Sequence, residues 1–356
     1  MPPCIAGTYN DMKKPACGKI IVESKIPFIN GLLEPYFDVA YLAPEQVTPK
    51  AMADADALIT RTRTRCDARL LDASPCRFIA TATIGTDHID LEYCRNRGIT
   101  VANAPGCNAP AVAQYVLSAI AYQRQLRGLS GPLSEITLGV VGVGHVGSIV
   151  VQWARANGIN VLCCDPPRAG SGDKSEEFVP LSRIAADCDV ITFHTPMTVG
   201  GLYATYHLAG SDFFRSLKRK PLLINSARGP VFDTVALLQA LDCGQVSDVV
   251  VDCWENEPDI DRRLLDRAIV ATPHIAGYSF EGKKRATQMA LDSVARFFGL
   301  PRIVIADSAP DGYPPAPSLE TIFKSYSPER DTSALRSAPH SFEALRNNYA
   351  YRPEVR

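Results

Sequence analysis

The sequence has no long apolar run and almost no net charge. Nowhere do about 18 apolar residues follow one another, so no transmembrane helix is expected. The N-terminal residues contain no apolar core of signal-peptide length. A formal net charge of −1 over 356 residues favours neither nucleic acid nor a membrane surface. The chain is therefore expected to bind neither, and any anion must be bound by a local group of residues.

Paired cysteines are also missing. The chain has 11 cysteines, an odd number, with no C-x-x-C pair, and Cys163, Cys164 and Cys253 lie within apolar runs. This pattern is typical of a reduced protein whose thiols act as small apolar residues. We expect a cytoplasmic protein without a metal site.

Short apolar runs alternate with helical segments along most of the chain. Five such runs between residues 19 and 104, and six between 137 and 273, have the composition of buried strands. A helix is predicted over 109–127, with one apolar stripe and Gly128 at its end. A second long helix is predicted over 280–299 and could pack back on the first set of strands. The predicted fold is α/β, because strands joined by helical crossovers form parallel sheets.

A glycine-rich loop follows the first strand of the second set. Gly142, Gly144 and Gly147 form G-x-G-x-x-G between a strand and a helix, and Asp165 ends the next strand. The glycines permit a tight turn, close approach of a pyrophosphate and close helix packing, and the acid would accept ribose hydroxyls. Tight turns use glycine in any case, but the ordered context favours NAD. The nearby Arg168 could hold the extra phosphate of NADP, so the exclusion of NADP stays open.

Three further segments each place one reactive side chain after a strand. They are LLINSARGP around Arg228, VVVDCWENEP around Glu257 and ATPHIAGY around His274. A guanidinium can hold a substrate carboxylate with two parallel bonds, and an imidazole oriented by a carboxylate can take a hydroxyl proton. Singly, each has an ordinary alternative: a surface ion pair, a turn residue and a buried histidine. Together they predict the catalytic set of a dehydrogenase.

These segments resemble the D-isomer-specific 2-hydroxyacid dehydrogenase family, over roughly residues 19–300. In that family the arginine binds the carboxylate, the histidine is the acid/base and the glutamate pairs with it, and these roles fall on Arg228, His274 and Glu257. The stretches CDPPRAG (164–170) and TPHIAGYSFEGK (272–283) are most similar to members that oxidise 4-phospho-D-erythronate in pyridoxal phosphate (vitamin B6) biosynthesis. The resemblance therefore implies NAD as cofactor and a small phosphorylated hydroxy acid as substrate.

The resemblance also implies further site residues. The substrate is expected to contact Thr62, Thr83 and Tyr278. The NAD site is expected to include the loop residues His145 and Val146 beside the three glycines. It should also take residues from the ends of later strands: Asp165, Thr195, Ser226, Ala227, Asp252 and Gly277.

The substrate's phosphate needs cations and hydroxyls, and TRTRTR (60–65) supplies both at a strand end. In a strand, successive side chains point to opposite faces, which would put the threonines on one face and the arginines on the other. Only some of these side chains could then reach a ligand. Arg61 is the candidate among the arginines, and a solvated edge is the alternative.

The chain is expected to have three parts. A doubly wound parallel-sheet NAD domain (108–284) is inserted in a flavodoxin-like substrate domain (19–107 and 285–300), and residues 301–356 form a linker and a dimerisation segment. A homodimer is expected. The resemblance also suggests about 17 extra residues at the N-terminus, so that Met12 is a possible start, and a dimerisation domain that could be incomplete at Arg356.

Three alternatives keep the same motifs. The chain could be a D-3-phosphoglycerate or hydroxypyruvate-type dehydrogenase with a different substrate pocket. It could be an NAD-sensing binding protein, like the family's transcriptional corepressors, or a truncated and inactive paralogue. The TRTRTR stretch and Tyr278 favour the enzyme with a phosphorylated substrate.

Two substitutions test the catalytic set. Arg228→Lys and His274→Asn should each lower turnover by roughly 100-fold or more while the fold survives, the usual scale for a lost acid/base group. Steady-state rates and circular dichroism measure this. A near-normal rate in either variant would refute the role of that residue.

Overall fold

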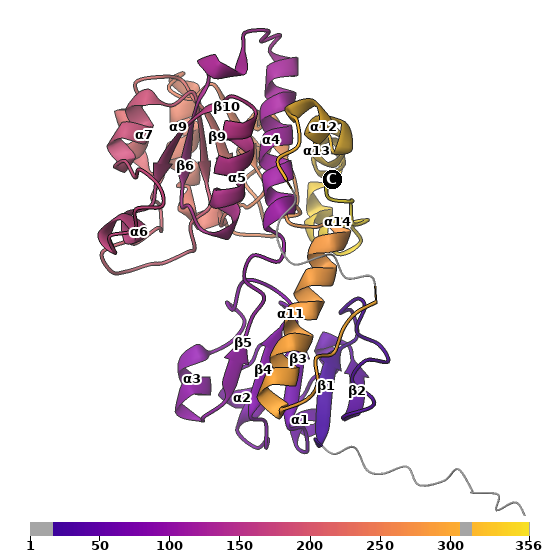
Figure 1. Cartoon of the computed structure of the whole chain (residues 1–356). Coiled ribbons are helices and arrows are strands. Elements are labelled where there is room, and N and C mark those ends of the chain that lie inside the picture. The colour runs from indigo at the N-terminus through magenta and orange to yellow at the C-terminus, as the bar shows by residue number, and fades with distance from the viewer. Residues whose placement is uncertain (1–16, 307–314, 356) are drawn as a thin grey trace, which may run out of the picture. The chain divides into compact units, whose positions relative to one another are not determined.

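The computed structural model describes residues 17–306 and 315–355. They form two compact units, one from residues 17–107 with 283–306, the other from residues 108–282 with 315–355 (Figure 1). The choice between an N-terminal extension and a start at Met12 lies outside the described residues, as does most of the proline-rich linker. Residues 108–282 of the second unit are inserted between the two chain segments of the first unit, as predicted.

The first unit contains a five-stranded parallel sheet in the order β2-β1-β3-β4-β5. This is the flavodoxin-like order, so the predicted fold is confirmed. The strands are β1 Lys19–Glu23, β2 Asp38–Leu42, β3 Ala57–Thr60, β4 Phe78–Thr81 and β5 Thr100–Ala102.

Helices cover both faces of this sheet because successive strand residues point to opposite sides. Ile20 packs against α11 (Phe280–Phe298), whereas Ile21 packs against the other side with α1 (Pro49–Met52), α2 (Ala68–Leu71) and α3 (Leu91–Asn96). Figure 1 shows α11 in orange, and its buried residues Leu291 and Val294 belong to the core of this unit. The helix predicted over 280–299 therefore packs on the first set of strands, as expected.

The second unit contains a six-stranded parallel sheet in the order β11-β10-β9-β8-β6-β7. The strand order reverses between β6 and β8, and ligands of doubly wound sheets bind at the carboxyl ends of the strands beside such a point. The strands are β6 Thr137–Val141, β7 Asn160–Cys164, β8 Val190–Phe193, β9 Leu222–Asn225, β10 Asp248–Val251 and β11 Val270–Ala271.

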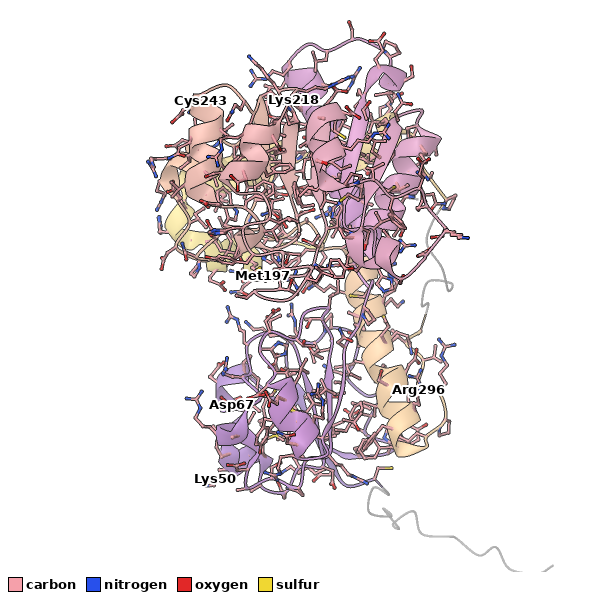
Figure 2. The ribbon with its side chains drawn as sticks, turned by 90° about the vertical axis from the view of Figure 1, so that its left-hand side faces the viewer. Lys50, Asp67, Met197, Lys218, Cys243 and Arg296 are labelled. Carbon is pink, nitrogen blue, oxygen red and sulfur yellow. The ribbon has the colours of Figure 1, made fainter. Side chains whose placement is uncertain are left out.

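Two helical layers bury this sheet. One layer contains α4 Ala109–Leu126 and α5 His145–Ala156, and the other contains α7 Leu181–Asp187, α8 Ser211–Ser216, α9 Thr234–Asp242 and α10 Arg262–Arg267. A short α6, Pro166–Gly170, follows β7. Figure 2 marks the two ends of the sheet: Met197 follows β8 at the carboxyl edge, whereas Lys218 and Cys243, which precede β9 and β10, lie at the opposite end.

The single apolar stripe predicted for the helix over 109–127 is wrong. Helix α4 is buried on almost every side, including its polar residues Gln114 and Ser118. The reason is the C-terminal segment, because Gln114 donates to Ser325 Oγ at 2.8 Å and Ser118 to the Ile322 carbonyl at 3.4 Å. Gly128 follows the helix with φ +63°, as its predicted end requires.

The C-terminal residues form three helices on the second unit. They are α12 Leu319–Ser325, α13 Glu329–Ser337 and α14 Phe342–Asn347 (Figure 1, yellow). Ile322 and Tyr326 pack with α4, and Leu335 and Phe342 enter the core on the other face. We expected a linker and dimerisation segment here, and the buried side chains of these helices pack into the core of this unit. Among the described residues, none of the helices combines the length and apolarity needed to cross a membrane.

Candidate active site

The glycine loop connects β6 to α5, and each of its glycines meets a different constraint. Gly142 has φ +88°, and a Cβ there would lie 2.9 Å from the His194 carbonyl carbon and the Thr195 nitrogen. At Gly147 a Cβ would lie 2.1 Å from the Gly142 oxygen, so helix and turn touch. A Cβ at Gly144 would meet nothing within 4 Å. The open position stands at the N-terminus of the 12-residue helix α5, whose first N–H groups and positive dipole end suit a pyrophosphate.

Asp165 binds the backbone of the glycine loop and of α6. Its two carboxylate oxygens accept from the Val143 N–H at 2.8 Å and the Arg168 N–H at 3.1 Å, the latter as N-cap of α6. A carboxylate can accept about four hydrogen bonds, so acceptor sites remain for ribose hydroxyls. The Arg168 guanidinium donates to Asp173 at 2.8 Å and to Ser175 at 2.7 Å.

Two hydroxyls at the carboxyl ends of neighbouring strands are buried without a partner among the described residues. Thr195 Oγ1 and Ser226 Oγ follow β8 and β9, and neither makes a hydrogen bond to the described residues. Buried polar groups are normally paired, so both need a partner such as a cofactor oxygen or an ordered water. The donors and acceptors at these strand ends therefore fit a dinucleotide.

The other residues predicted for the NAD site lie in different environments. His145 is exposed at the start of α5, Val146 is half-buried against the α4–α5 core, and Ala227 is buried after β9. Gly277 approaches Asn108 so closely that a Cβ would lie 2.0 Å from Asn108 Nδ2.

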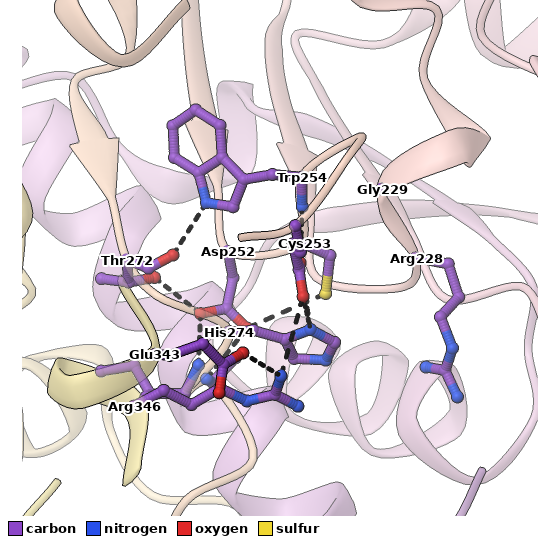
Figure 3. A network of polar contacts seen from close by, with 12 residues as sticks. Arg228, Gly229, Asp252, Cys253, Trp254, Thr272, His274, Glu343 and Arg346 are labelled. Carbon is purple, nitrogen blue, oxygen red and sulfur yellow. Dashed lines mark hydrogen bonds and ion pairs between the residues drawn. The ribbon is translucent and has the colours of Figure 1, made fainter. Parts of the chain in front are cut away.

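Asp252 is fully buried beneath the loop that follows β11. Its carboxylate accepts from Thr272 Oγ1 at 2.7 Å, the Ile275 N–H at 2.7 Å and the Ala276 N–H at 3.0 Å. Burial raises the pKa of Asp252 above its usual range, although the nearby His274 and these hydrogen bonds act in the opposite direction. In this environment Asp252 positions the loop that carries His274 (Figure 3).

His274 and Glu257 form a hydrogen-bonded pair. His274 Nδ1 lies 2.9 Å from Glu257 Oε2 and 3.1 Å from Oε1, and Glu257 Oε1 also accepts from the Trp254 N–H at 2.8 Å. His274 has φ +57°, a conformation that costs energy in a residue with a side chain and that gathers at functional sites. Its N–H donates to the Asp252 carbonyl at 2.9 Å, which helps to hold that conformation.

Glu257 is held as an anion. Burial favours its neutral form, but the contacts with His274, the Trp254 N–H and the Arg346 guanidinium outweigh burial and lower the pKa of Glu257 below its ordinary value. An ionised carboxylate at Nδ1 fixes the imidazole tautomer and leaves Nε2 for proton exchange.

A second histidine at the same edge cannot replace His274. His194 follows β8, and its Nε2 lies 3.0 Å from Thr192 Oγ1. Burial lowers the pKa of His194 to about 3, so its ring stays neutral at physiological pH. A general acid/base needs a group that exchanges protons near neutrality, which excludes His194.

Arg228 stands on a rigid loop after β9. The buried Asn225 side chain donates to the Arg228 carbonyl at 3.0 Å and accepts from the Ala227 N–H at 3.1 Å. Gly229 passes so close to Trp254 that a Cβ would lie 1.8 Å from its carbonyl oxygen. The half-buried Arg228 guanidinium donates to the Ala227 carbonyl at 2.9 Å.

Three of the residues predicted to bind the substrate, Thr62, Thr83 and Arg61, lie in the first unit. Strand β3 ends at Thr60, so the alternation predicted for TRTRTR does not extend through the whole stretch. Thr60 and Thr64 both donate to the buried Glu23, as the alternation requires, but Thr62 is not buried with them. Thr62 is exposed, and the Arg61 guanidinium donates to the Lys25 carbonyl at 3.2 Å. Thr83 Oγ1 lies 2.7 Å from Thr81 Oγ1 and donates to the Gly85 carbonyl at 3.1 Å.

Arg346 is a site residue that sequence reasoning missed. It comes from α14 (Figure 3). Its Nη1 lies 3.8 Å from Glu257 Oε2, and its Nε donates to the Tyr278 hydroxyl at 3.3 Å. No motif surrounds it, and the polar C-terminal residues predicted no packing against the catalytic loops. Only the fold brings Arg346 to Glu257.

Comparisons with known proteins agree with this geometry. Residues 110–276 match the model of the family "D-isomer specific 2-hydroxyacid dehydrogenase, NAD binding domain". The chain is 47% identical to an erythronate-4-phosphate dehydrogenase of Bacteroides thetaiotaomicron, over 94% of this chain and 97% of the relative. It is 39% identical to one of Escherichia coli O81, over 94% and 92%. A solved D-lactate dehydrogenase of Aquifex aeolicus, in complex with NAD and lactic acid, aligns with TM-score 0.63 and 26% identity over 79% of this chain and 96% of that one.

Two glycine substitutions separate packing from cofactor binding. Gly147→Ala forces a methyl group onto the Gly142 carbonyl and should destabilise the protein by about 1–3 kcal/mol, the usual cost of overpacking. Gly144→Ala meets no protein atom, so stability should hold while NADH binding weakens, because the methyl group stands where a pyrophosphate would approach. Thermal denaturation without cofactor and NADH fluorescence titration measure the two effects. Equal effects of both substitutions on stability would contradict this assignment.

Proposed function

The chain belongs to the erythronate-4-phosphate dehydrogenases of the D-isomer specific 2-hydroxyacid dehydrogenase family, and from this membership we propose that it oxidises 4-phospho-D-erythronate with NAD. The product is (R)-3-hydroxy-2-oxo-4-phosphooxybutanoate, an intermediate of vitamin B6 biosynthesis. The observation that carries the proposal is the 2.9 Å contact between His274 Nδ1 and an ionised Glu257, next to the loop that holds Arg228.

The chemistry assigns one task to each member of this set. Arg228 holds the substrate carboxylate with parallel hydrogen bonds and so fixes carbon 2. His274 Nε2 takes the proton of the carbon-2 hydroxyl as the C=O bond forms, and Glu257 stabilises the resulting imidazolium. Bound NAD supplies the acceptor for the hydride that leaves carbon 2. The reverse reaction uses the same groups, with His274 as the acid.

The remaining assignments are part of the proposal. Tyr278, Thr62, Thr83 and Arg61 bind the substrate, and the division into a substrate domain (19–107 and 285–300), an NAD domain (108–284) and a C-terminal segment (301–356) follows the family. The proposed NAD-site residues are those predicted above. Among them, the buried carboxylate of Asp252 acts by positioning the loop that carries His274. A cytoplasmic homodimer is the proposed state of the protein.

The preference for NAD over NADP is assigned to Asp165. Its carboxylate accepts ribose hydroxyls and repels the extra phosphate of NADP. The pairing of Arg168 with Asp173 and Ser175 supports NAD, since that guanidinium already has acceptors in the protein.

A substrate comparison tests the activity. The purified full chain with NAD should form NADH from 4-phospho-D-erythronate at least about tenfold more efficiently, in kcat/KM, than from D-3-phosphoglycerate or D-glycerate, because polar groups left unpaired penalise the wrong ligand. NADH absorbance measures the rates, and the His274→Asn variant is the control for background oxidation. Preference for another acid would overturn the substrate, and no turnover of any of the three would overturn the enzymatic role.

A cofactor comparison tests Asp165. Asp165→Ala should lower the preference for NAD over NADP by about tenfold or more, the scale of a lost hydrogen bond to a charged group. The ratio of kcat/KM for the two cofactors measures it, with Asp173→Ala as a second variant that removes the ion pair of Arg168. An unchanged ratio in Asp165→Ala would remove the assignment.

A further inference from the structure

Helix α14 delivers a guanidinium to the acid–base pair from outside the predicted NAD domain. Arg346 Nη1 lies 3.8 Å from Glu257 Oε2, the same oxygen that lies 2.9 Å from His274 Nδ1. Its Nε donates to the Tyr278 hydroxyl at 3.3 Å. One side chain thus touches both the carboxylate that orients the base and the tyrosine proposed to bind substrate.

The position of Arg346 is determined by packing on both sides of it in the chain. Phe342, one helical turn earlier, is 1% exposed in the core of the same unit. Arg352, six residues later, is buried, and its guanidinium donates to the carbonyls of Ile275 at 3.0 Å and Ala111 at 3.1 Å. The chain that carries Arg346 is therefore anchored to the catalytic loop itself.

Several charged or titratable groups surround the Glu257 carboxylate, and Arg346 differs from the others in contact with it in carrying a permanent positive charge. The side chains of His274 and Arg346 lie beside its carboxylate, and Glu343 lies 3.8 Å from Arg346 Nη1, the same nitrogen that lies 3.8 Å from Glu257 Oε2. The other titratable groups nearby are the buried Cys253 thiol, which stays protonated because burial raises its pKa well above the usual range, the buried Asp252 and, next to Cys253, Arg228. Arg346 is the permanent positive charge in direct contact with Glu257.

We propose that Arg346 is a positioning residue of the reaction: it keeps Glu257 ionised and directed at His274, and it holds the Tyr278 hydroxyl for the substrate. This role rests on the proposed dehydrogenase function, which it deepens. It makes the C-terminal segment part of the active site.

The sign of the expected pH effect follows from the charge. A guanidinium beside Glu257 opposes proton binding by the Glu257–His274 pair, because it favours the state with the carboxylate charged and adds positive charge near the ring. Without it the pair takes up a proton more readily, at higher pH. The rate, which requires the unprotonated base, should then fall at a higher pH than in the wild type.

Arg346→Gln is the test, with Arg346→Lys as the conservative variant and Arg330→Gln, an exposed cation on α13, as the matched control. In Arg346→Gln the acidic limb of the pH profile of kcat/KM, where the rate falls as the base becomes protonated, should move to higher pH by about half to one pH unit. The KM for the substrate should also rise. Arg346→Lys should restore the limb, because the charge returns, but not the KM, because a lysine lacks the planar donors for Tyr278. Arg330→Gln should match the wild type.

A second readout does not depend on activity. The ring signals of His274, assigned by NMR from their loss in His274→Asn, should titrate at higher pH in Arg346→Gln than in the wild type. A uniform loss of rate in Arg346→Gln with an unmoved limb and unmoved His274 signals would overturn the role of Arg346. A moved His274 titration in a protein that oxidises none of the substrates would support that role while overturning the proposed function.

Discussion

The site depends on the buried carboxylate of Asp252. It accepts from the Thr272 hydroxyl and from the N–H groups of Ile275 and Ala276, while the backbone carbonyl of the same residue accepts from His274. Burying a carboxylate is costly unless its acceptor sites are filled, so the loop after β11 must fold tightly around it. That geometry holds His274 at φ +57° and turns its ring to Glu257.

A strained catalytic residue needs a rigid frame, and the parallel sheet supplies it. The loops of Arg228, Glu257 and His274 leave the adjacent strands β9, β10 and β11 at their carboxyl ends. Asn225 and Trp254 then tie these loops together, because Asn225 donates to the Cys253 carbonyl at 3.3 Å and the Trp254 indole donates to the Thr272 carbonyl at 2.9 Å. The reactive groups are therefore positioned by backbone that cannot move independently.

Much of this could be predicted along the chain. The strands, the glycine loop and the polar residues after β9, β10 and β11 are local patterns, and the family resemblance is carried by the same stretches. The errors arose where contacts are remote in sequence. Helix α4 was predicted with one apolar stripe because its second partner, α12, lies about 200 residues later. The alternation predicted for TRTRTR fails at the exposed Thr62, while Thr60 and Thr64 both bind Glu23, which lies about 40 residues earlier.

The sequence by itself determined the α/β fold class, the glycine loop and the catalytic set of Arg228, Glu257 and His274, because each depends on residues close together along the chain. The tertiary structure alone decided that Asp252 lies beneath the catalytic loop and that Arg346 reaches Glu257. A buried carboxylate and a guanidinium acquire their roles from the charges and donors packed around them. Those neighbours come from segments far apart in sequence, and only folding brings them into contact.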